Sequence, residues 1–163
     1  MAKNAQAGNW LRLAASLAGP FAAGGFGSLF MGNLRSAWYA GLAKPSFMPP
    51  GWAFGIVWPI LYLLMGIAAF LVWRRGLGQG RVRVALILFA SQLVLNAAWT
   101  PAFFGLRMPG AGLAVVAALW AMVAATLWAF ARISRLSAGL LGPYLAWVTF
   151  AGVLNGSICW LNR

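Results

Sequence analysis

Residues 45–73 read PSFMPPGWAFGIVWPILYLLMGIAAFLVW, a run of 29 residues that contains no charge. A helix needs about 20 predominantly apolar residues to cross the ~30 Å hydrocarbon core of a bilayer. Four more charge-free runs are long enough, at residues 13–34, 84–106, 108–131 and 136–162. The sequence therefore predicts five transmembrane helices, at about 10–31, 52–74, 82–104, 110–131 and 138–161.

The composition is typical of an all-α integral membrane protein rather than of a soluble domain. Hydrophobic residues make up 63% of the 163 residues and charged residues 7%, whereas an ordinary globular protein is about one quarter charged. The five predicted spans fill most of the chain, so we expect one membrane domain over residues 1–163, folded as a bundle of five transmembrane helices. Only the connection at about 32–51, called loop 1, is long.

The ionisable residues exclude most hydrolytic and metal-dependent chemistry. The chain has 12 Lys and Arg residues but no Asp, Glu or His. A Ser-His-Asp triad, a pair of catalytic carboxylates and a metal site built from His or carboxylates are therefore excluded. We expect no bound metal, and general acid–base chemistry near neutral pH would fall to Cys, Lys or Tyr.

The basic residues separate the long apolar runs instead of forming one cluster. A net charge of +12 could indicate a nucleic-acid partner, but this spacing favours membrane lipid as the partner and no nucleic acid. The positive-inside rule predicts a cytoplasmic N-terminus, with loop 1 on the far side. The N-terminal side would carry Lys3, Arg12, Arg74, Arg75, Arg81, Arg83, Arg132 and Arg135, and the other side Arg35, Lys44, Arg107 and Arg163.

Aromatic and polar side chains recur at helical spacing inside three of the predicted spans. The three faces are Gln92, Asn96, Trp99 and Phe103; Tyr144, Trp147, Ala151 and Asn155; and Trp58, Tyr62 and Met65. An amide in hydrocarbon is costly unless it is paired, so Gln92, Asn96 and Asn155 should face the interior of the bundle. The pattern indicates either a polar interface between helices or a ligand pocket.

Two stripes of small residues allow helices to approach closely. They are Gly19, Ala23 and Gly27 in the first span and Ala117, Ala121 and Ala125 in the fourth. Small residues four apart are common at contacts between membrane helices. Spacing alone does not separate internal packing from a seam between two copies of the chain.

Three blocks of sequence carry a resemblance to a known family. Residues 38–52 read WYAGLAKPSFMPPGW, residues 92–105 read QLVLNAAWTPAFFG and residues 143–155 read PYLAWVTFAGVLN. In this order they resemble the loop 1, third-helix and fifth-helix signatures of the TspO/MBR family. The resemblance implies a five-helix bundle, often a homodimer, with loop 1 acting as a lid over a pocket. It also implies a bacterial-type envelope membrane.

The same resemblance implies a ligand. Members of the family bind tetrapyrroles such as protoporphyrin IX and haem, so we expect a porphyrin or haem ligand and no obligatory cofactor. Sterol binding is not predicted, because Gly156 stands where the sterol-associated pattern has Tyr. The resemblance, together with the three faces, predicts that the ligand-binding residues are Trp38, Trp58, Tyr62, Gln92, Asn96, Trp99, Phe103, Trp147 and Ala151. Arg35 and Lys44 are the cations available in the lid for the propionates of the ligand.

These expectations favour a tetrapyrrole-binding membrane sensor or transporter that regulates tetrapyrrole metabolism or a stress response. One alternative is a protein that degrades porphyrin in the light, with Trp58 and Trp147 as the photochemical residues. We expect no enzymatic activity beyond this light-dependent degradation. A second alternative is a structural subunit of a larger membrane complex, whose acid-free surface would suit an anionic partner.

Overall fold

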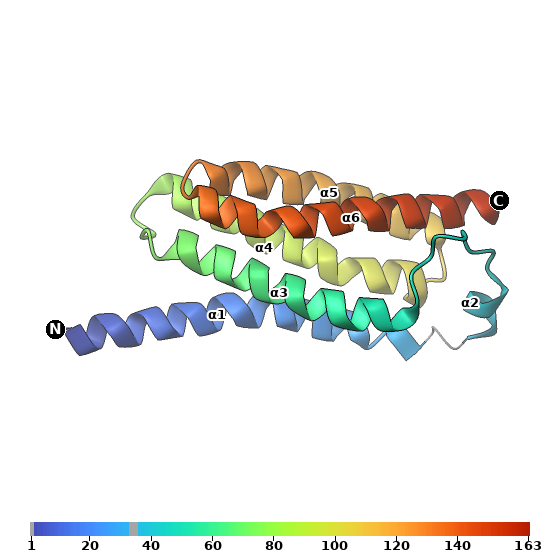
Figure 1. Cartoon of the computed structure of the whole chain (residues 1–163), viewed down its shortest axis with the longest axis horizontal. Coiled ribbons are helices and arrows are strands. Elements are labelled where there is room, and N and C mark those ends of the chain that lie inside the picture. Colours follow the sequence, from blue (N-terminus) through green and yellow to red (C-terminus); the bar gives the residue numbers. More distant parts are fainter. Residues whose placement is uncertain (1, 33–35) are drawn as a thin grey trace.

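The computed structural model of the chain describes residues 2–32 and 36–163. In these residues five long helices lie side by side in one elongated bundle, which confirms the all-α prediction (Figure 1). The helices are α1 (Ala2–Ser28), α3 (Gly51–Trp73), α4 (Gly80–Thr100), α5 (Pro109–Ala131) and α6 (Arg135–Leu161). Two short elements accompany them: α2 (Ala37–Gly41) within loop 1, and the π-helical turn η2 (Pro101–Gly105) that continues α4.

Four of the long helices are apolar enough to cross a membrane. Among the described residues these are α3, α4 together with η2, α5 and α6. Their ends lie within three residues of the predicted ones. Helix α1 was expected over 10–31 but runs from Ala2 to Ser28, and it does not reach the same apolarity. Arg12, Pro20 and the Gly and Ser residues of α1 explain its lower hydropathy.

Proline and serine residues set several of the helix ends. Pro50, in extended backbone, directly precedes α3. Pro109 takes the first position of α5, where a backbone N–H is not needed for the helical hydrogen bonds. The Oγ atom of Ser134 caps α6 by accepting a hydrogen bond from the backbone N–H of Ser137. The turn before α5 is tight enough to hold Arg107 at a φ of 56°.

The connections divide between the two ends of the bundle. Loop 2 (residues 74–79) and loop 4 (residues 132–134) lie at the end where α1 begins (Figure 1). Loop 1 with α2, loop 3 (residues 106–108) and the C-terminus lie at the opposite end. This up-and-down order brings residues of loop 1 against the ends of η2 and α6, which are distant in the sequence.

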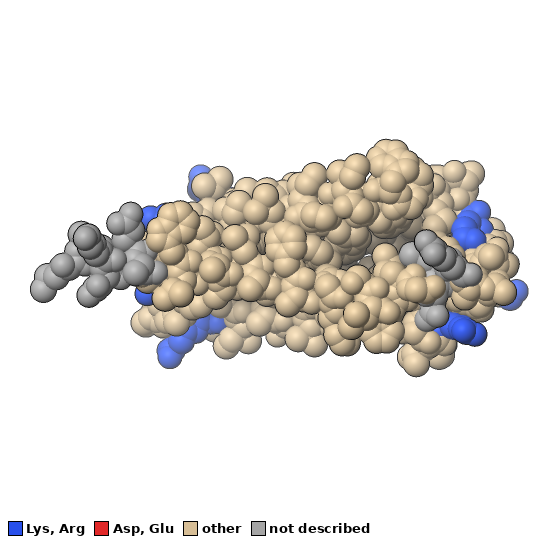
Figure 2. Space-filling view, turned by 90° about the horizontal axis from the view of Figure 1, so that it is seen from below, with Lys and Arg blue, Asp and Glu red and all other residues tan. Residues whose placement is uncertain are grey.

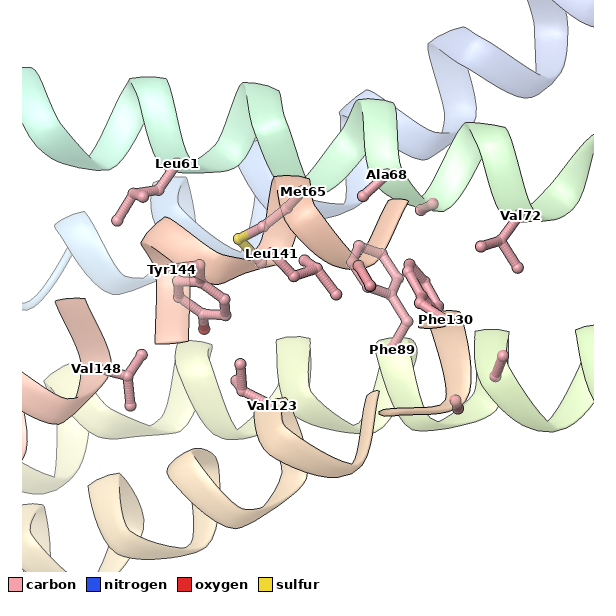
Figure 3. Packing of buried hydrophobic residues seen from close by; sticks show 14 of the residues in the cluster. Leu61, Met65, Ala68, Val72, Phe89, Val123, Phe130, Leu141, Tyr144 and Val148 are labelled. Atoms are coloured by element: carbon pink, nitrogen blue, oxygen red, sulfur yellow. The ribbon is translucent and has the colours of Figure 1, made fainter. Parts of the chain in front are cut away.

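The main core is formed by apolar side chains from α3, α4, α5 and α6 (Figure 3). Met65, Val72 and Phe130 are completely buried there. The rings of Phe89 and Phe130 stack with their centroids 5.9 Å apart. Because the sequence has no acidic side chain, this close packing and a small number of hydrogen bonds hold the helices together.

Glycines bring α1 close to α3. A Cβ atom added to Gly66 of α3 would lie 2.9 Å from the Cα atom of Leu17 and 3.1 Å from the carbonyl oxygen of Ser16. A side chain at this position would therefore collide with the backbone of α1. Gly24 of α1 is in turn covered by the ring of Tyr62 from α3.

The first stripe of small residues is internal packing. A Cβ atom on Gly19 would lie 3.2 Å from Leu93, and one on Gly27 would lie 3.0 Å from the Oγ1 atom of Thr100, both on α4. The other stripe behaves differently, since Ala117 and Ala121 on α5 are exposed. Of the two stripes, only the one on α5 is therefore open to a second copy of the chain or to lipid.

Candidate functional site

The turn η2 places two phenylalanines inside the bundle. Its defining hydrogen bond runs from the backbone N–H of Leu106 to the carbonyl oxygen of Pro101, over 2.9 Å. This wider turn begins at a proline and carries both Phe103 and Phe104 inward, where they are 2% and 5% exposed. Phe103 was predicted from its helical face and Phe104 was not. Pro101 in the middle of a span was the available signal, because π-helical turns often mark functional sites.

Loop 1 covers these rings with its short helix α2. Trp38 meets the ring of Phe103 edge to face at 6.0 Å, and Tyr39 lies 5.4 Å from Phe104. Trp99, one turn earlier on α4, stacks on Phe103 at 5.5 Å with an angle of 25° between the rings. The structure thus brings together Trp38, Trp99 and Phe103, as the sequence predicted. We call these five rings the aromatic site.

A second group of rings lies between α3 and α6. Trp58 packs against Tyr62 at 5.4 Å and against Tyr144 at 6.4 Å. On the α6 side, Trp147 meets the edge of Phe54 at 5.7 Å. Trp58, Tyr62 and Trp147 therefore share the α3–α6 contact, and Ala151 lies one turn beyond Trp147 against the same core. We call this group the α3–α6 ring cluster.

A chain of buried hydrogen bonds joins α4 to α6. The Nδ2 atom of Asn96 donates to the hydroxyl oxygen of Tyr144 over 3.0 Å. That hydroxyl in turn donates to Oε1 of Gln92 over 3.1 Å. Tyr144 is 0% exposed and both amides are buried. The prediction that Gln92 and Asn96 face the interior is confirmed, and the hydroxyl of Tyr144 is a partner that helical spacing did not identify.

Several buried polar atoms beside these rings are left without a partner. Among the described residues, they include the N–H groups at Nε1 of Trp99 and Trp147, Nε2 of Gln92, and the carbonyl oxygen Oδ1 of Asn155. An unpaired polar atom in an apolar interior costs roughly 1–3 kcal/mol. These three donors and one acceptor are spread over the two groups of rings and the helices next to them.

The two predicted lid cations have different outcomes. Arg35 lies outside the described residues. The ammonium group of Lys44 donates to the carbonyl oxygens of Tyr39, at 2.7 Å, and Leu42, at 3.3 Å. It also lies 4.5 Å from the centre of the Tyr39 ring. Lys44 thus stabilises the fold of loop 1, while burial raises the pKa of the Tyr39 hydroxyl and keeps it neutral.

The side-chain amide of Asn162, the residue directly after α6, anchors loop 1 to the bundle. Oδ1 of Asn162 accepts from the backbone N–H of Ala43, and Nδ2 of Asn162 donates to the carbonyl oxygen of the same residue, both over 2.9 Å. This double contact mimics the pairing of two peptide groups. Together with Lys44, it holds loop 1 against the end of the bundle that contains the aromatic site.

An apolar groove opens on the outside of the α3–α6 ring cluster. Its volume is about 480 Å³, and Trp147 forms part of its wall. The lining residues are Val57, Ile60, Leu61, Leu64, Pro143, Ala146, Trp147 and Phe150. The groove lies between α3 and α6, two candidate membrane spans, so one side of Trp147 is open to the outside of the bundle.

These features define an all-helical integral membrane protein with an aromatic site under a loop at one end. A model of the TspO/MBR family matches residues 16–161. The tryptophan-rich protein TspO of Chlorobaculum tepidum is 45% identical over 141 residues, which cover 86% of this chain and 89% of that protein. The translocator protein of Homo sapiens is 45% identical over 130 residues, covering 79% and 77%. The tryptophan-rich sensory protein of Cereibacter sphaeroides is 44% identical over 126 residues, covering 77% of each.

The chain belongs to the TspO/MBR family, as the three sequence blocks indicated. Two of those blocks supply the polar chain between α4 and α6, and the third supplies α2 and Lys44 of loop 1. The signatures of the family therefore coincide with the part of the bundle where aromatic rings and unpaired polar atoms gather.

Replacing Tyr144 with Phe tests the polar chain. The substitution removes the hydroxyl that pairs both amides, so it strands one N–H of Asn96 and the carbonyl oxygen of Gln92. We expect the free energy of unfolding to fall by about 1–3 kcal/mol. Thermal unfolding of the purified protein in detergent, followed by circular dichroism, would measure the change.

Tyr62→Phe is the matched control, because it removes a hydroxyl from a partly buried ring without breaking this chain. It should leave the melting temperature nearly unchanged. Equal melting temperatures for Tyr144→Phe and the parent protein would show that the three side chains contribute no stability through their hydrogen bonds.

Proposed function

We propose that this protein binds tetrapyrroles within the membrane and acts as a sensor or transporter for them. The observation that carries the proposal is the aromatic site, in which the indole N–H of Trp99 is buried and unpaired. A flat apolar macrocycle suits aromatic walls, against which it can stack. The polar groups at its edge could satisfy the unpaired donors of Trp99, Trp147 and Gln92.

Two further properties support this class of ligand. The names of two relatives, translocator protein and tryptophan-rich sensory protein, describe transport and sensing. In addition, a tetrapyrrole bears carboxylates, and this chain has only basic side chains to meet them. Lys44 would exchange a backbone carbonyl for a propionate, and Arg35 is the second predicted cation. The chain has no His for an iron ligand, so recognition would depend on ring shape rather than on the metal.

Fluorescence quenching tests this function directly. Titration of the purified protein with protoporphyrin IX and with haem should give saturable quenching of tryptophan fluorescence, with similar affinities for the two. Asn96→Leu, which breaks the polar chain beside Trp99, should weaken binding by about two- to tenfold. Val94→Leu, an exposed position on the same helix, is the control and should bind like the parent protein. Quenching that never saturates would contradict the proposal.

Light-dependent degradation of porphyrin is the second candidate function. It is favoured by the α3–α6 ring cluster, where Trp58 and Trp147 offer oxidisable indoles next to further aromatic rings. The chemistry would come from the excited pigment, because the side chains include no conventional acid–base pair. The unpaired Nε1 atom of Trp147 supports a polar contact to a ligand at this point.

Replacing Trp58 or Trp147 with Phe separates binding from photochemistry. A stacking contact is worth about 0.5–1.5 kcal/mol, so affinity should fall only about two- to tenfold. Bleaching under illumination, normalised to bound pigment, should fall much further because Phe is hard to oxidise. Trp128→Phe on the exposed side of α5 is the control. If Trp58→Phe and Trp147→Phe both bleach the pigment as fast as the parent protein, the two tryptophans contribute only to packing.

The five-span arrangement is also proposed, with α1 as the fifth span. Its support is that α1 packs along α3 and α4 over much of their length (Figure 1). Five spans place the termini on opposite sides of the membrane, with the N-terminus in the cytoplasm. Single-cysteine variants Lys3→Cys and Arg163→Cys, each combined with Cys159→Ser, should react with an impermeant thiol reagent from opposite sides. Labelling from one side would refute five spans.

The homodimer and the bacterial-type envelope membrane implied by the family resemblance stay predictions. The exposed stripe at Ala117 and Ala121 of α5 is the part of the bundle best suited to such a contact, because small side chains let two helices approach closely. Loop 1 would act as a lid in the same proposal, anchored by Asn162 at the end that holds the aromatic site.

A further inference from the structure

Six exposed arginines gather at the end of the bundle opposite the aromatic site. They flank loops 2 and 4, which connect the four apolar helices there (Figure 1). Figure 2 shows the blue basic side chains at the two ends of the visible face and none along its middle. We call this group the arginine end; it consists of Arg74, Arg75, Arg81, Arg83, Arg132 and Arg135.

These charges have no counterion in the protein. The sequence contains no Asp or Glu, and the terminal carboxylate lies at the opposite end of the bundle (Figure 1). A neutral group offers the nearest contact in loop 2, where Nε of Arg81 donates to Oε1 of Gln79 over 3.0 Å. Like charges held together repel one another, so a bound anion from outside the chain would stabilise this end.

Two of the arginines lie along the sides of the bundle. The guanidinium carbon of Arg132 is 4.7 Å from the centre of the Trp128 ring, and that of Arg74 is 5.8 Å from the Phe70 ring. Each arginine therefore folds back over its own helix by one turn. Trp128 is 62% exposed near the end of a candidate membrane span, where tryptophan rings commonly lie at the level of the lipid headgroups. This geometry puts the guanidinium group of Arg132 beside the bilayer, at the depth of the headgroups, rather than out in the water.

The first turn of α4 adds to the need for an anion. A helix N-terminus is stabilised by negative charge, but α4 carries Arg81 and Arg83 there and no acidic residue. Its preceding residue, Gln79, gives no side-chain cap within the described part of the chain. An anion at this point would offset both the helix dipole and the two arginines.

We propose that the arginine end binds the phosphate groups of anionic phospholipids, so that the protein gathers acidic lipid around loops 2 and 4. The partner must be anionic because nothing in the chain neutralises these residues. It is a lipid because Arg132 and Arg74 lie along membrane-spanning helices. The opposite end has fewer free cations among the described residues. Lys44 there already donates to two carbonyl oxygens of loop 1, and only Arg163 folds over an exposed ring, that of Trp160.

Lipid selectivity in reconstituted membranes tests the proposal. The full chain would be placed in vesicles of phosphatidylcholine, with trace spin-labelled phosphatidylglycerol or phosphatidylcholine, and the immobilised fraction of each label measured by electron paramagnetic resonance. We expect the protein to prefer phosphatidylglycerol by about two- to fivefold, and the preference to shrink in high salt. Equal immobilisation of the two lipids would overturn the proposal.

Paired variants locate the preference. Arg132→Gln with Arg135→Gln should lower it by at least half, while Arg107→Gln with Arg163→Gln removes the same charge at the opposite end, where the cations are fewer, and should lower it much less. If the loop 4 variant does not fold, Arg81→Gln with Arg83→Gln serves in its place. An equal loss from the control pair would show a general charge effect and overturn the assignment to the arginine end.

Two further arms distinguish other anions. Inorganic phosphate and chloride, compared at the same ionic strength, should reduce the preference for phosphatidylglycerol to the same extent. An acidic polypeptide such as polyglutamate should not displace phosphatidylglycerol from the protein. Displacement by free phosphate would make the site one for soluble anions, and displacement by the polypeptide would indicate a protein partner; either result would overturn the proposal of a lipid.

Discussion

Hydrocarbon offers no hydrogen-bond partner, and this constraint shapes the whole bundle. The helices satisfy their own backbone groups, which leaves the few polar side chains inside as the places where one helix can be matched to another. Gln92, Asn96 and Tyr144 solve the problem among themselves and thereby fix how α4 lies against α6. The indole N–H groups of Trp99 and Trp147 have no hydrogen-bond partner among the described residues. The hydrogen-bonded side chains fix the helix contact. The unpaired N–H groups are where a ligand would gain the most hydrogen-bond energy.

Shape takes the place of charge in holding the helices together. Without acidic side chains the chain cannot form a salt bridge between helices, so close contact supplies the attraction. Gly112 of α5 is an example of such close contact. A Cβ atom there would lie 2.9 Å from the Phe103 ring and 3.2 Å from the Asn155 amide nitrogen. The absence of a side chain at Gly112 of α5 thus makes the room in which Phe103 of η2 and Asn155 of α6 lie close together.

The sequence predicted the helices better than the site, for physical reasons. Charge-free runs mark what lipid can surround, so α3 to α6 followed directly. The turn η2 inserts an extra residue at Pro101, which changes the helical period and brings in Phe104. The sequence predicted Lys44 as a cation for the ligand, but its ammonium group donates to a carbonyl oxygen of its own loop. This contact depends on the backbone conformation, so the sequence alone could not predict it. Of the two alternatives, the polar interface is present in the hydrogen bonds that join α4 to α6, and the ligand pocket stays a prediction.

An acid-free chain with basic residues at both ends is complementary to carboxylates and phosphates wherever it meets them. At the aromatic end its cation is folded into loop 1, so an anionic ligand would have to compete with backbone carbonyls and would loosen that loop as it binds. At the arginine end the described cations donate to no backbone carbonyl, and Arg81 donates only to the side chain of Gln79, so anions there would bind without rearranging the bundle. Under the proposed function, binding at the first end would therefore be coupled to a change in loop 1. Binding at the second would hold the protein in its membrane without altering the site.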